Sequence, residues 1–329
     1  MPTPSGMPIL PGQTGLPSGL PAQATPQRKK VHGPKVLLQG EPGNGKTDVI
    51  RTLLESGLNV FVFFTEPGME VLMDRRRGKV YTCGEGLHWI YIPPVVAGWD
   101  ALAAGANLIS TMSYKAVSEM NGTNKEKYRQ YFEFIAAHTK CKCDRCGREF
   151  GDVGRLEPYD KWAVVYDSLT SLSIMALNLV IGDKPAAHQG EWGMAMMNLE
   201  RFINKACYDI PSMMVLLAHI EREGDEVTGG QMNMASTLGR KLAPKIPRPF
   251  SDVIHARREG TKFMWSTITP NMLLKTRSLE LRADLLPSFR PIVEKWHASV
   301  KSETEYWENE ERMTELTKQQ LKELNGNKG

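Results

Sequence analysis

The chain of 329 residues lacks any long hydrophobic run. A helix that spans a membrane needs about 20 consecutive, mostly apolar residues, whereas the richest runs here, such as residues 213–218, have the length of a strand. The amino terminus also lacks the charged start and apolar core of a secretory signal peptide. From these absences we expect neither a membrane protein nor a secreted one.

The chain has few cysteines and only a small excess of positive over negative charge. The five cysteines are an odd number, with three of them between positions 141 and 146, which is not the pattern of a secreted disulfide framework. Lys and Arg (41) exceed Asp and Glu (37) by only four, an excess that permits a polyanionic partner without requiring one. The 41% of hydrophobic and 24% of charged residues are typical of a globular protein with a sizeable core. We therefore predict a protein of the reducing cytoplasm.

Proline, glycine and charge divide the chain into three parts. Residues 1–34 contain 8 of the 21 prolines and no acidic residue, a composition that cannot bury enough apolar surface to become ordered. Residues 35–297 are predicted to form one large α/β core, with a cysteine-containing insertion at about residues 138–160. Residues 298–329 are polar and rich in Glu and Lys, which predicts a helical tail.

The apolar runs of the core predict a sheet covered on both faces. Continuous rather than alternating apolar runs are typical of buried parallel strands, and helical patterns lie between them. Three later segments alternate and are predicted to add antiparallel strands to one edge. The predicted fold is therefore a mostly parallel central sheet with antiparallel edge strands and helices on both faces. The continuous strands are residues 36–38, 59–64, 162–166 and 213–218; the helices are 47–56, 174–180 and 192–207; the alternating segments are 252–256, 262–267 and 271–275.

Residues 40–47, GEPGNGKT, match the phosphate-binding loop GxxxxGK[ST] between a predicted strand and a predicted helix. Glycines let backbone N–H groups approach the phosphates, and the helix amino terminus adds a partial positive charge. Lys46 is expected to contact the β- and γ-phosphates, and the Thr47 hydroxyl to bind Mg²⁺. The predicted ATP contacts in this loop are Gly40, Glu41, Pro42, Gly43, Asn44, Gly45, Lys46, Thr47 and Asp48.

Polar residues at the ends of three other predicted strands complete the expected site. Asp167 closes a buried strand and is predicted to hold Mg²⁺, with Ser168 beside it, because burying an unpaired carboxylate is expensive. Glu66 follows the second strand and is the candidate for orienting the attacking water, in preference to Glu70 in the next helical turn. His219 follows a fourth strand and is either a γ-phosphate sensor or a hydrogen-bonded strand end.

The order of these motifs resembles the RecA-like recombinase core and, within that group, phage-encoded ATPases of the Sak single-strand-annealing type. The likeness rests on residues 40–47, Glu66, residues 164–172 (VVYDSLTSL) and His219, and extends over about residues 35–297. It implies that Glu66 activates water and that His219 stands where RecA has the Gln that couples the γ-phosphate to a DNA-binding loop. We find no counterpart of RecA's separate carboxyl-terminal domain. The leader, residues 1–34, shows no clear aromatic polymerisation motif, so ring and filament assembly both stay open.

The same resemblance implies cations and loops that act beyond a single subunit. Lys275 and Arg277 correspond to paired cations that enter the ATP site of a neighbouring copy, with solvated edge charges as the alternative. Residues 221–231 correspond to the second DNA loop, and residues 182–188 are a weaker candidate for the first. Residues 240–295 hold 12 Lys and Arg against 5 Asp and Glu, a local excess suited to single-stranded DNA.

The sequence therefore predicts a hydrolase: an ATPase, stimulated by single-stranded DNA, that acts as a homo-oligomer in phage DNA recombination or annealing. Its location would then be the cytoplasm of the host bacterium. A helicase loader, a packaging motor or a KaiC-like switch with the same core is the first alternative. A module in which nucleotide only gates assembly with a protein partner is the second.

The cysteine cluster predicts a structural zinc site. The Cys143-x-x-Cys146-Gly spacing is that of a zinc knuckle, in which two thiolates bind at a tight turn. A closed site needs four ligands, and the expected set is Cys141, Cys143, Cys146 and His138, with Cys83 as a substitute for His138. A reduced, metal-free loop is the alternative, because no second CxxC pair is present.

Overall fold

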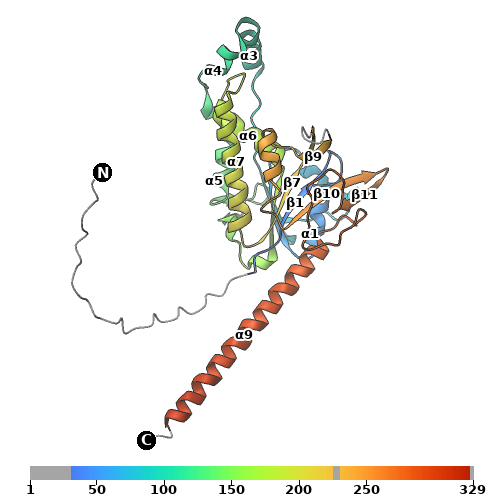
Figure 1. Cartoon of the computed structure of the whole chain (residues 1–329), viewed down its shortest axis with the longest axis vertical. Coiled ribbons are helices and arrows are strands. Elements are labelled where there is room, and N and C mark those ends of the chain that lie inside the picture. Colours follow the sequence, from blue (N-terminus) through green and yellow to red (C-terminus); the bar gives the residue numbers. More distant parts are fainter. Residues whose placement is uncertain (1–30, 225–229, 327–329) are drawn as a thin grey trace, which may run out of the picture. The chain divides into compact units, whose positions relative to one another are not determined.

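The computed structural model describes residues 31–224 and 230–326, which form a helix-covered sheet (Figure 1). The sheet has seven strands in the order β11-β10-β1-β7-β6-β2-β3. Neighbouring strands are parallel except for the edge pair β10 and β11. The predicted α/β fold, with a mostly parallel central sheet and an antiparallel pair at one edge, is thereby confirmed. The strands are β1 (Lys35–Gln39), β2 (Asn59–Phe64), β3 (Leu87–Tyr91), β6 (Trp162–Asp167), β7 (Met213–Ala218), β10 (Asp252–Glu259) and β11 (Lys262–Ser266).

The continuous apolar strands are buried because helices cover both faces of the sheet. Successive side chains of a strand point to opposite faces, so that Val60 and Val62 enter one core cluster while Phe61 and Phe63 enter the other. The cluster with Val60 and Val62 packs beneath the short helix after the phosphate-binding loop and the start of the long last helix. The cluster with Phe61 and Phe63 packs beneath a helical layer on the opposite face. The helices of that layer are α5 (Gln130–Ala137), α6 (Leu169–Ile181) and α7 (Gln189–Asp209).

Smaller elements fill the connections. Two hairpins lie outside the main sheet, β4 (Cys141–Lys142) with β5 (Glu149–Gly151) and β8 (Ile220–Gly224) with β9 (Gln231–Ala235). The helical segments are η1 (Asp48–Ile50), α1 (Arg51–Glu55), α2 (Met69–Met73), η2 (Arg75–Arg77), η3 (Cys83–Glu85), α3 (Trp99–Thr111), α4 (Tyr114–Glu119), η4 (Lys125–Tyr128), η5 (Val153–Arg155), η6 (Tyr159–Lys161), α8 (Gly239–Leu242), η7 (Ala243–Lys245) and α9 (Arg290–Gly326).

Two of the predicted edge segments differ from expectation. Residues 252–256 belong to β10, which pairs parallel with β1 and not antiparallel, with Val36 opposite Asp252. Residues 271–275 form only isolated bridges at Met272 and Lys275 instead of a strand. The chain turns away there because the buried Asp252 carboxylate accepts hydrogen bonds from the backbone N–H groups of Arg277 and Ser278. The parallel edge strand β3 was not predicted.

The ends of the chain differ in what the structure describes. The predicted disordered leader, residues 1–34, lies outside the described residues except for its last four positions. The polar tail is helical, but α9 begins inside the core, where Ile292, Val293 and Trp296 are buried. From Lys301 onward its described side chains are mostly exposed. Among the described residues, none of the helices combines the length and apolarity needed to cross a membrane.

Candidate nucleotide site

The phosphate-binding loop connects β1 to η1 at the carboxyl edge of the parallel strands. Gly43 and Gly45 have φ of 78° and 77°, a left-handed backbone that favours glycine. A Cβ atom on Gly40 would lie 2.3 Å from the carbonyl oxygen of Ala256 in β10, so only glycine fits there. The predicted helix 47–56 forms as the 3-10 turn η1 followed by α1. The GxxxxGKT pattern therefore meets the backbone requirements of a phosphate loop.

Lys46 lies within this loop with its ammonium group held by loop carbonyls. Its Nζ donates to the carbonyl oxygens of Gly40 (2.8 Å) and Glu41 (2.9 Å). Burial lowers the pKa of Lys46, while the carboxylates of Asp167, Glu66 and Glu41 act in the opposite direction. The positive charge is thus concentrated at the position that a P-loop lysine occupies against phosphate oxygens.

Asp167 and Thr47 meet at the end of β6 in a pair suited to Mg²⁺. The Thr47 hydroxyl donates to Asp167 Oδ2 over 2.7 Å. Asp167 is 2% exposed, and burial raises its pKa to about 6, with the neighbouring Glu66 adding to the shift and Thr47 and Lys46 opposing it. A hydroxyl and a carboxylate are the hard oxygen ligands that Mg²⁺ requires. Thr47 and Lys46 offset only part of the cost of burying the Asp167 carboxylate, so a bound cation would stabilise it. The residues therefore fit Mg²⁺.

Glu66 follows β2 and points toward the same edge. Its Oε1 lies 3.2 Å from His219 Nε2, and its Oε2 accepts a hydrogen bond from the Ser171 hydroxyl over 3.1 Å. Burial favours the neutral acid, but the hydrogen bond and charge of His219 and the hydroxyls beside it leave the pKa of Glu66 below its ordinary value. The carboxylate is therefore ionised at neutral pH and fixed at both oxygens. Glu70, the competing carboxylate, is exposed in the first turn of α2.

His219 connects the loop lysine to Glu66. Its Nδ1 lies 3.3 Å from Lys46 Nζ. Because an ammonium group can only donate, Nδ1 is the acceptor, and the ring proton is assigned to Nε2, which donates to Glu66. The carbonyl oxygen of His219 accepts from the backbone N–H of Ser236 (2.7 Å) at the base of the β8–β9 hairpin. One residue thus contacts the phosphate loop, the carboxylate and the hairpin.

Three residues of the site were missed from the sequence. Thr65 holds the ends of β2 and β6 together, because its hydroxyl accepts from Ser168 N (2.9 Å) and donates to Ser168 O (3.0 Å). Ser171 in α6 orients Glu66, as described above. Arg51 is the third. Thr65 and Ser171 stand within four residues of a predicted site residue, and this adjacency was the available signal.

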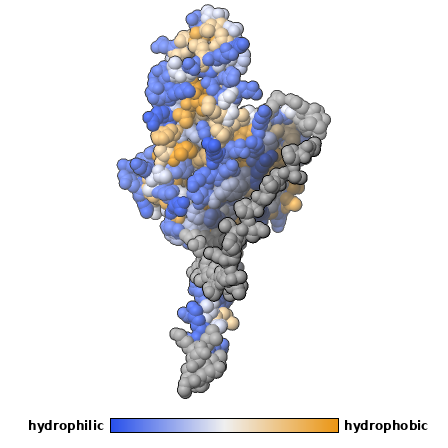
Figure 2. All heavy atoms as spheres, turned by 60° about the vertical axis from the view of Figure 1, so that its left-hand side comes forward, coloured by the Kyte–Doolittle hydropathy of each residue, from blue (hydrophilic) through white to orange (hydrophobic). Residues whose placement is uncertain are grey.

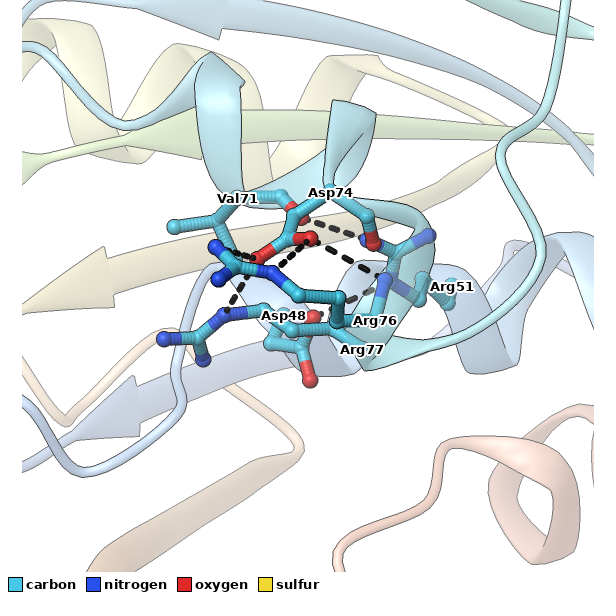
Figure 3. Close-up of polar contacts among 6 residues, drawn as sticks. All are labelled: Asp48, Arg51, Val71, Asp74, Arg76 and Arg77. Carbon is cyan, nitrogen blue, oxygen red and sulfur yellow. Dashed lines mark hydrogen bonds and ion pairs between the residues drawn. The ribbon is translucent and has the colours of Figure 1, made fainter.

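Arg51 is a buried arginine at the start of α1 (Figure 3). It is 4% exposed and donates to the carbonyl oxygens of Val71 (2.5 Å) and Lys79 and, through Nε, to Asp48 Oδ1 (3.0 Å). These bonds join the helix after the phosphate loop to the chain that follows Glu66. The nearby Asp74 instead caps η2 and pairs with the surface residue Arg76.

Lys275 and Arg277 are not brought to the phosphate loop of their own chain. Lys275 pairs with Val253 at the amino-terminal end of β10, whereas the loop follows the carboxyl end of the adjacent, parallel β1. Lys275 Nζ donates to the carbonyl oxygen of Arg248 (2.9 Å), and Arg277 is exposed. Any contact of these cations with ATP would therefore be with the site of another copy.

The predicted DNA loops are more acidic or more tightly paired than expected. The described strands of the β8–β9 hairpin carry Glu221, Arg222 and Glu223, and its residues 225–229 lie outside those described. Within residues 182–188, Lys184 is buried and forms a 2.6 Å ion pair with Glu191. That lysine therefore holds the start of α7 and is not available to a phosphate backbone.

The structure brings together two of the four predicted zinc ligands. Cys143 and Cys146 lie beside Cys83, which was expected only as a substitute for His138, and beside His88, which was not predicted. Cys141 points into the hydrophobic core, and His138 stacks on Phe63 with its Nε2 2.9 Å from Tyr166 Oη. His138 and Cys141 lie just before the turn in the sequence, but their side chains face the main sheet and not the turn.

Comparison with known proteins adds a family and distant structural likenesses. A family model described as an AAA domain matches residues 32–278. No curated protein matches. The flagellar accessory protein FlaH from Methanocaldococcus jannaschii is 12% identical, with a TM-score of 0.33 over 72% of this chain and 78% of that one. The RadB recombinase is 12% identical, with a TM-score of 0.32 over 72% and 81%. An ATPase from the type III secretion system of pathogenic bacteria is 11% identical, with a TM-score of 0.36 over 69% of this chain and 53% of its own.

Proposed function

The chain belongs to the AAA domain family, and we propose that this RecA-like P-loop ATPase hydrolyses Mg²⁺-ATP to act on single-stranded DNA in phage recombination or annealing. The observation that carries the ATP hydrolysis in this proposal is the convergence of Lys46, Thr47, Asp167 and Glu66 at one edge of the sheet. Phosphoryl transfer to water needs a phosphate cradle, a metal site and a group that orients the nucleophile. These four residues supply all three.

Each residue has a part in hydrolysis that follows from its contacts. Mg²⁺, when bound, neutralises charge that develops on the phosphate oxygens. Thr47 and Asp167 hold that ion, and Lys46 turns from the loop carbonyls to the β- and γ-phosphates. The ionised Glu66 accepts a hydrogen bond from the attacking water and directs it at the γ-phosphorus. His219 and Ser171 each engage one Glu66 oxygen, so the carboxylate keeps one orientation.

His219 supports a coupling between the nucleotide and the β8–β9 hairpin. When Lys46 moves to phosphate, His219 Nδ1 loses its donor, and the ring is free to respond. The backbone of the same residue anchors the hairpin through Ser236. We propose that this hairpin and nearby exposed cations contact the DNA backbone. Arg258 and Lys262 at the β10–β11 turn are exposed on the same edge, where the ring of Phe263 lies close to Gly45.

We further propose a homo-oligomer, in which Lys275 and Arg277 serve the site of a neighbouring copy. Their position at the opposite end of the sheet from the phosphate loop supports this arrangement. So does apolar surface on and near α3 and α4, where Val96, Trp99 and Tyr114 are 82%, 87% and 73% exposed. Orange areas mark apolar residues in the upper part of Figure 2. Apolar surface of this kind is typical of interaction sites.

DNA binding is tested by fluorescence anisotropy of a labelled thymidine oligonucleotide with a non-hydrolysable ATP analogue. We expect nucleotide to tighten binding, and affinity to fall steeply with salt, because released counterions drive phosphate contacts. The double variant Arg258→Ala/Lys262→Ala should bind more weakly, with a shallower salt dependence. Lys301→Ala, which removes an exposed cation from α9, is the matched control. Absence of binding at low salt in all nucleotide states would overturn the DNA part of the proposal.

A further inference from the structure

Four metal-binding side chains meet beside the edge strand β3. Cys83 lies in η3, His88 in β3, and Cys143 and Cys146 in the turn between β4 and β5. Their ligand atoms all lie within 4.8 Å of one another. They come from segments about 55 to 60 positions apart in the chain, so the fold and not local spacing assembles them. Nothing in the nucleotide site uses them.

Two distances between ligand atoms match a tetrahedral metal site, and all four ligand atoms lie within 4.8 Å of one another. With a Zn–S bond of about 2.3 Å, tetrahedral geometry places neighbouring ligand atoms about 3.8 Å apart. The sulfurs of Cys83 and Cys143 are 3.9 Å apart, and Cys146 Sγ is 3.7 Å from His88 Nδ1. An ion at the centre would therefore bond to both pairs with little movement of the backbone.

The donor set identifies the metal. Three thiolates and one imidazole are soft or borderline ligands that select zinc over Mg²⁺ or Ca²⁺. The alternative of a disulfide does not fit, because the sulfur separation of 3.9 Å is well beyond an S–S bond of about 2.05 Å, and the cysteines are free thiols.

The turn itself has the form of a zinc knuckle. The N–H of Gly147 donates to the carbonyl oxygen of Cys143 (2.8 Å), and the N–H of Cys143 to that of Arg148 (2.9 Å). Gly147 has φ of 73°, the left-handed conformation that lets the chain reverse directly after Cys146. This reversal aims both sulfurs at the same point.

We propose that Cys83, His88, Cys143 and Cys146 bind one structural Zn²⁺ that fastens the β4–β5 hairpin to the edge of the sheet. The four protein ligands close the coordination shell, which is typical of structural and not catalytic zinc. The hairpin also covers the free edge of β3, since Asp144 N donates to Trp89 O (2.9 Å) and Tyr91 N donates to Asp144 Oδ2 (2.7 Å). Packing of Phe150 on Phe61 and Trp162 also holds this hairpin against the sheet. Zinc would add a stronger link and so help to protect an edge open to strand pairing.

The test is metal analysis of the full chain expressed with zinc and passed through gel filtration. We expect about one equivalent of zinc in the wild-type protein and in Cys141→Ser, the matched control that lies two positions from a ligand. Cys83→Ser and Cys143→Ser should each lose at least about tenfold in zinc affinity. A metal-free wild-type protein would overturn the proposal. So would loss of zinc in Cys141→Ser with retention in Cys83→Ser, the result expected for the ligand set predicted from sequence.

A second measurement needs no variant and covers the case in which Cys83→Ser does not fold. A strong chelator should make Cys83, Cys143 and Cys146 of the wild-type protein more reactive toward iodoacetamide, as followed by peptide mass spectrometry. Cys207, in α7, should be unchanged. Unchanged alkylation of Cys83 after metal removal would contradict its assignment as a ligand.

Discussion

Asp167 is the residue whose electrostatics depend most on a bound cation. Its carboxylate is almost fully buried, and its pKa is raised to about 6 by that burial. In the unfolded chain the same group titrates near 3.8. Above pH 6 the folded protein therefore contains an ionised Asp167 carboxylate whose burial costs free energy. Binding of Mg²⁺ offsets this cost.

This predicts that Asp167→Asn stabilises the nucleotide-free protein at pH 7 while abolishing Mg²⁺-dependent ATP binding. The gain in free energy of unfolding should be on the order of 1 to 3 kcal/mol, since one pKa unit corresponds to 1.36 kcal/mol. It should shrink as pH falls through 6 and vanish below about 4, where the wild-type carboxyl is neutral in both states. Urea unfolding between pH 4 and 8 measures it. A variant less stable than wild type at pH 7 would show that the burial cost is compensated in some other way.

Glu66 is predicted to act in hydrolysis and not in binding. Glu66→Gln keeps the side-chain volume but cannot accept the water's hydrogen bond as an anion, so turnover should fall by about 10² to 10⁴-fold with nearly unchanged ATP affinity. Glu70→Gln, an exposed carboxylate four positions on, is the control and should turn over like wild type. A steady-state ATPase assay beside equilibrium binding of a fluorescent ATP analogue separates the two effects. Equal turnover in both variants would remove Glu66 from the mechanism.

Residues of this site could be predicted from the sequence where their position in a motif or at a strand end already brings them to the site. Lys46 and Thr47 follow from a local motif, while Glu66, Asp167 and His219 follow from the rule that parallel strands end at a common edge. Ser171 and Thr65 could not be predicted, because their roles depend on which hydroxyl reaches which carboxylate or carbonyl.

At the scale of elements, Arg51 shows how one side chain fixes the position of a segment. It joins α1 to the chain after Glu66 through hydrogen bonds to the carbonyl oxygens of Val71 (Figure 3) and Lys79. The loop between α2 and η3 has little regular structure of its own. Its position relative to the phosphate loop therefore depends on this guanidinium.

Replacing Arg51 with Met should lower the free energy of unfolding by about 3 kcal/mol, because it removes the hydrogen bonds of a buried guanidinium to the carbonyl oxygens of Val71 and Lys79 and its ion pair with Asp48. Arg76→Met, on the same segment but with its side chain 90% exposed, should leave the urea midpoint unchanged. The two midpoints measured in parallel test the prediction. A small effect of Arg51→Met would mean that water replaces the lost donor.

Elements were predicted well where they are buried on both faces and poorly at the edges. Each of the central strands β1, β2, β6 and β7 contains a continuous apolar run that predicts a buried strand. The predicted direction of β10 was wrong, because the polar residues Asp252 and His255 interrupt the apolar residues of a segment that is nevertheless largely buried. His88 was missed as a neighbour of Cys143 and Cys146, and Cys83 was predicted only as a substitute for His138, because both approach the cysteine turn only after β3 joins the sheet edge.

At the scale of the whole molecule, the position of Lys275 and Arg277 predicts a site shared between copies. Lys275→Ala/Arg277→Ala should hydrolyse ATP poorly although its own phosphate loop is intact. Lys46→Ala should also be inactive but still carries the cations. An equimolar mixture of these two variants should recover roughly a quarter of wild-type turnover. Half of the subunits have an intact loop and half have intact cations, so about one head-to-tail interface in four joins an intact loop to intact cations. Wild-type turnover in the Lys275→Ala/Arg277→Ala protein alone would contradict a shared site.

A single assay of the full chain decides whether it is the DNA-responsive ATPase that we propose. ATP turnover of the full chain is followed in Mg²⁺ with and without single-stranded DNA, with particle size monitored in the same samples. The account predicts turnover that depends on Mg²⁺ and rises when DNA is added. Turnover at background in every DNA context, together with nucleotide-dependent changes in particle size, would contradict it and favour a module in which ATP only gates assembly.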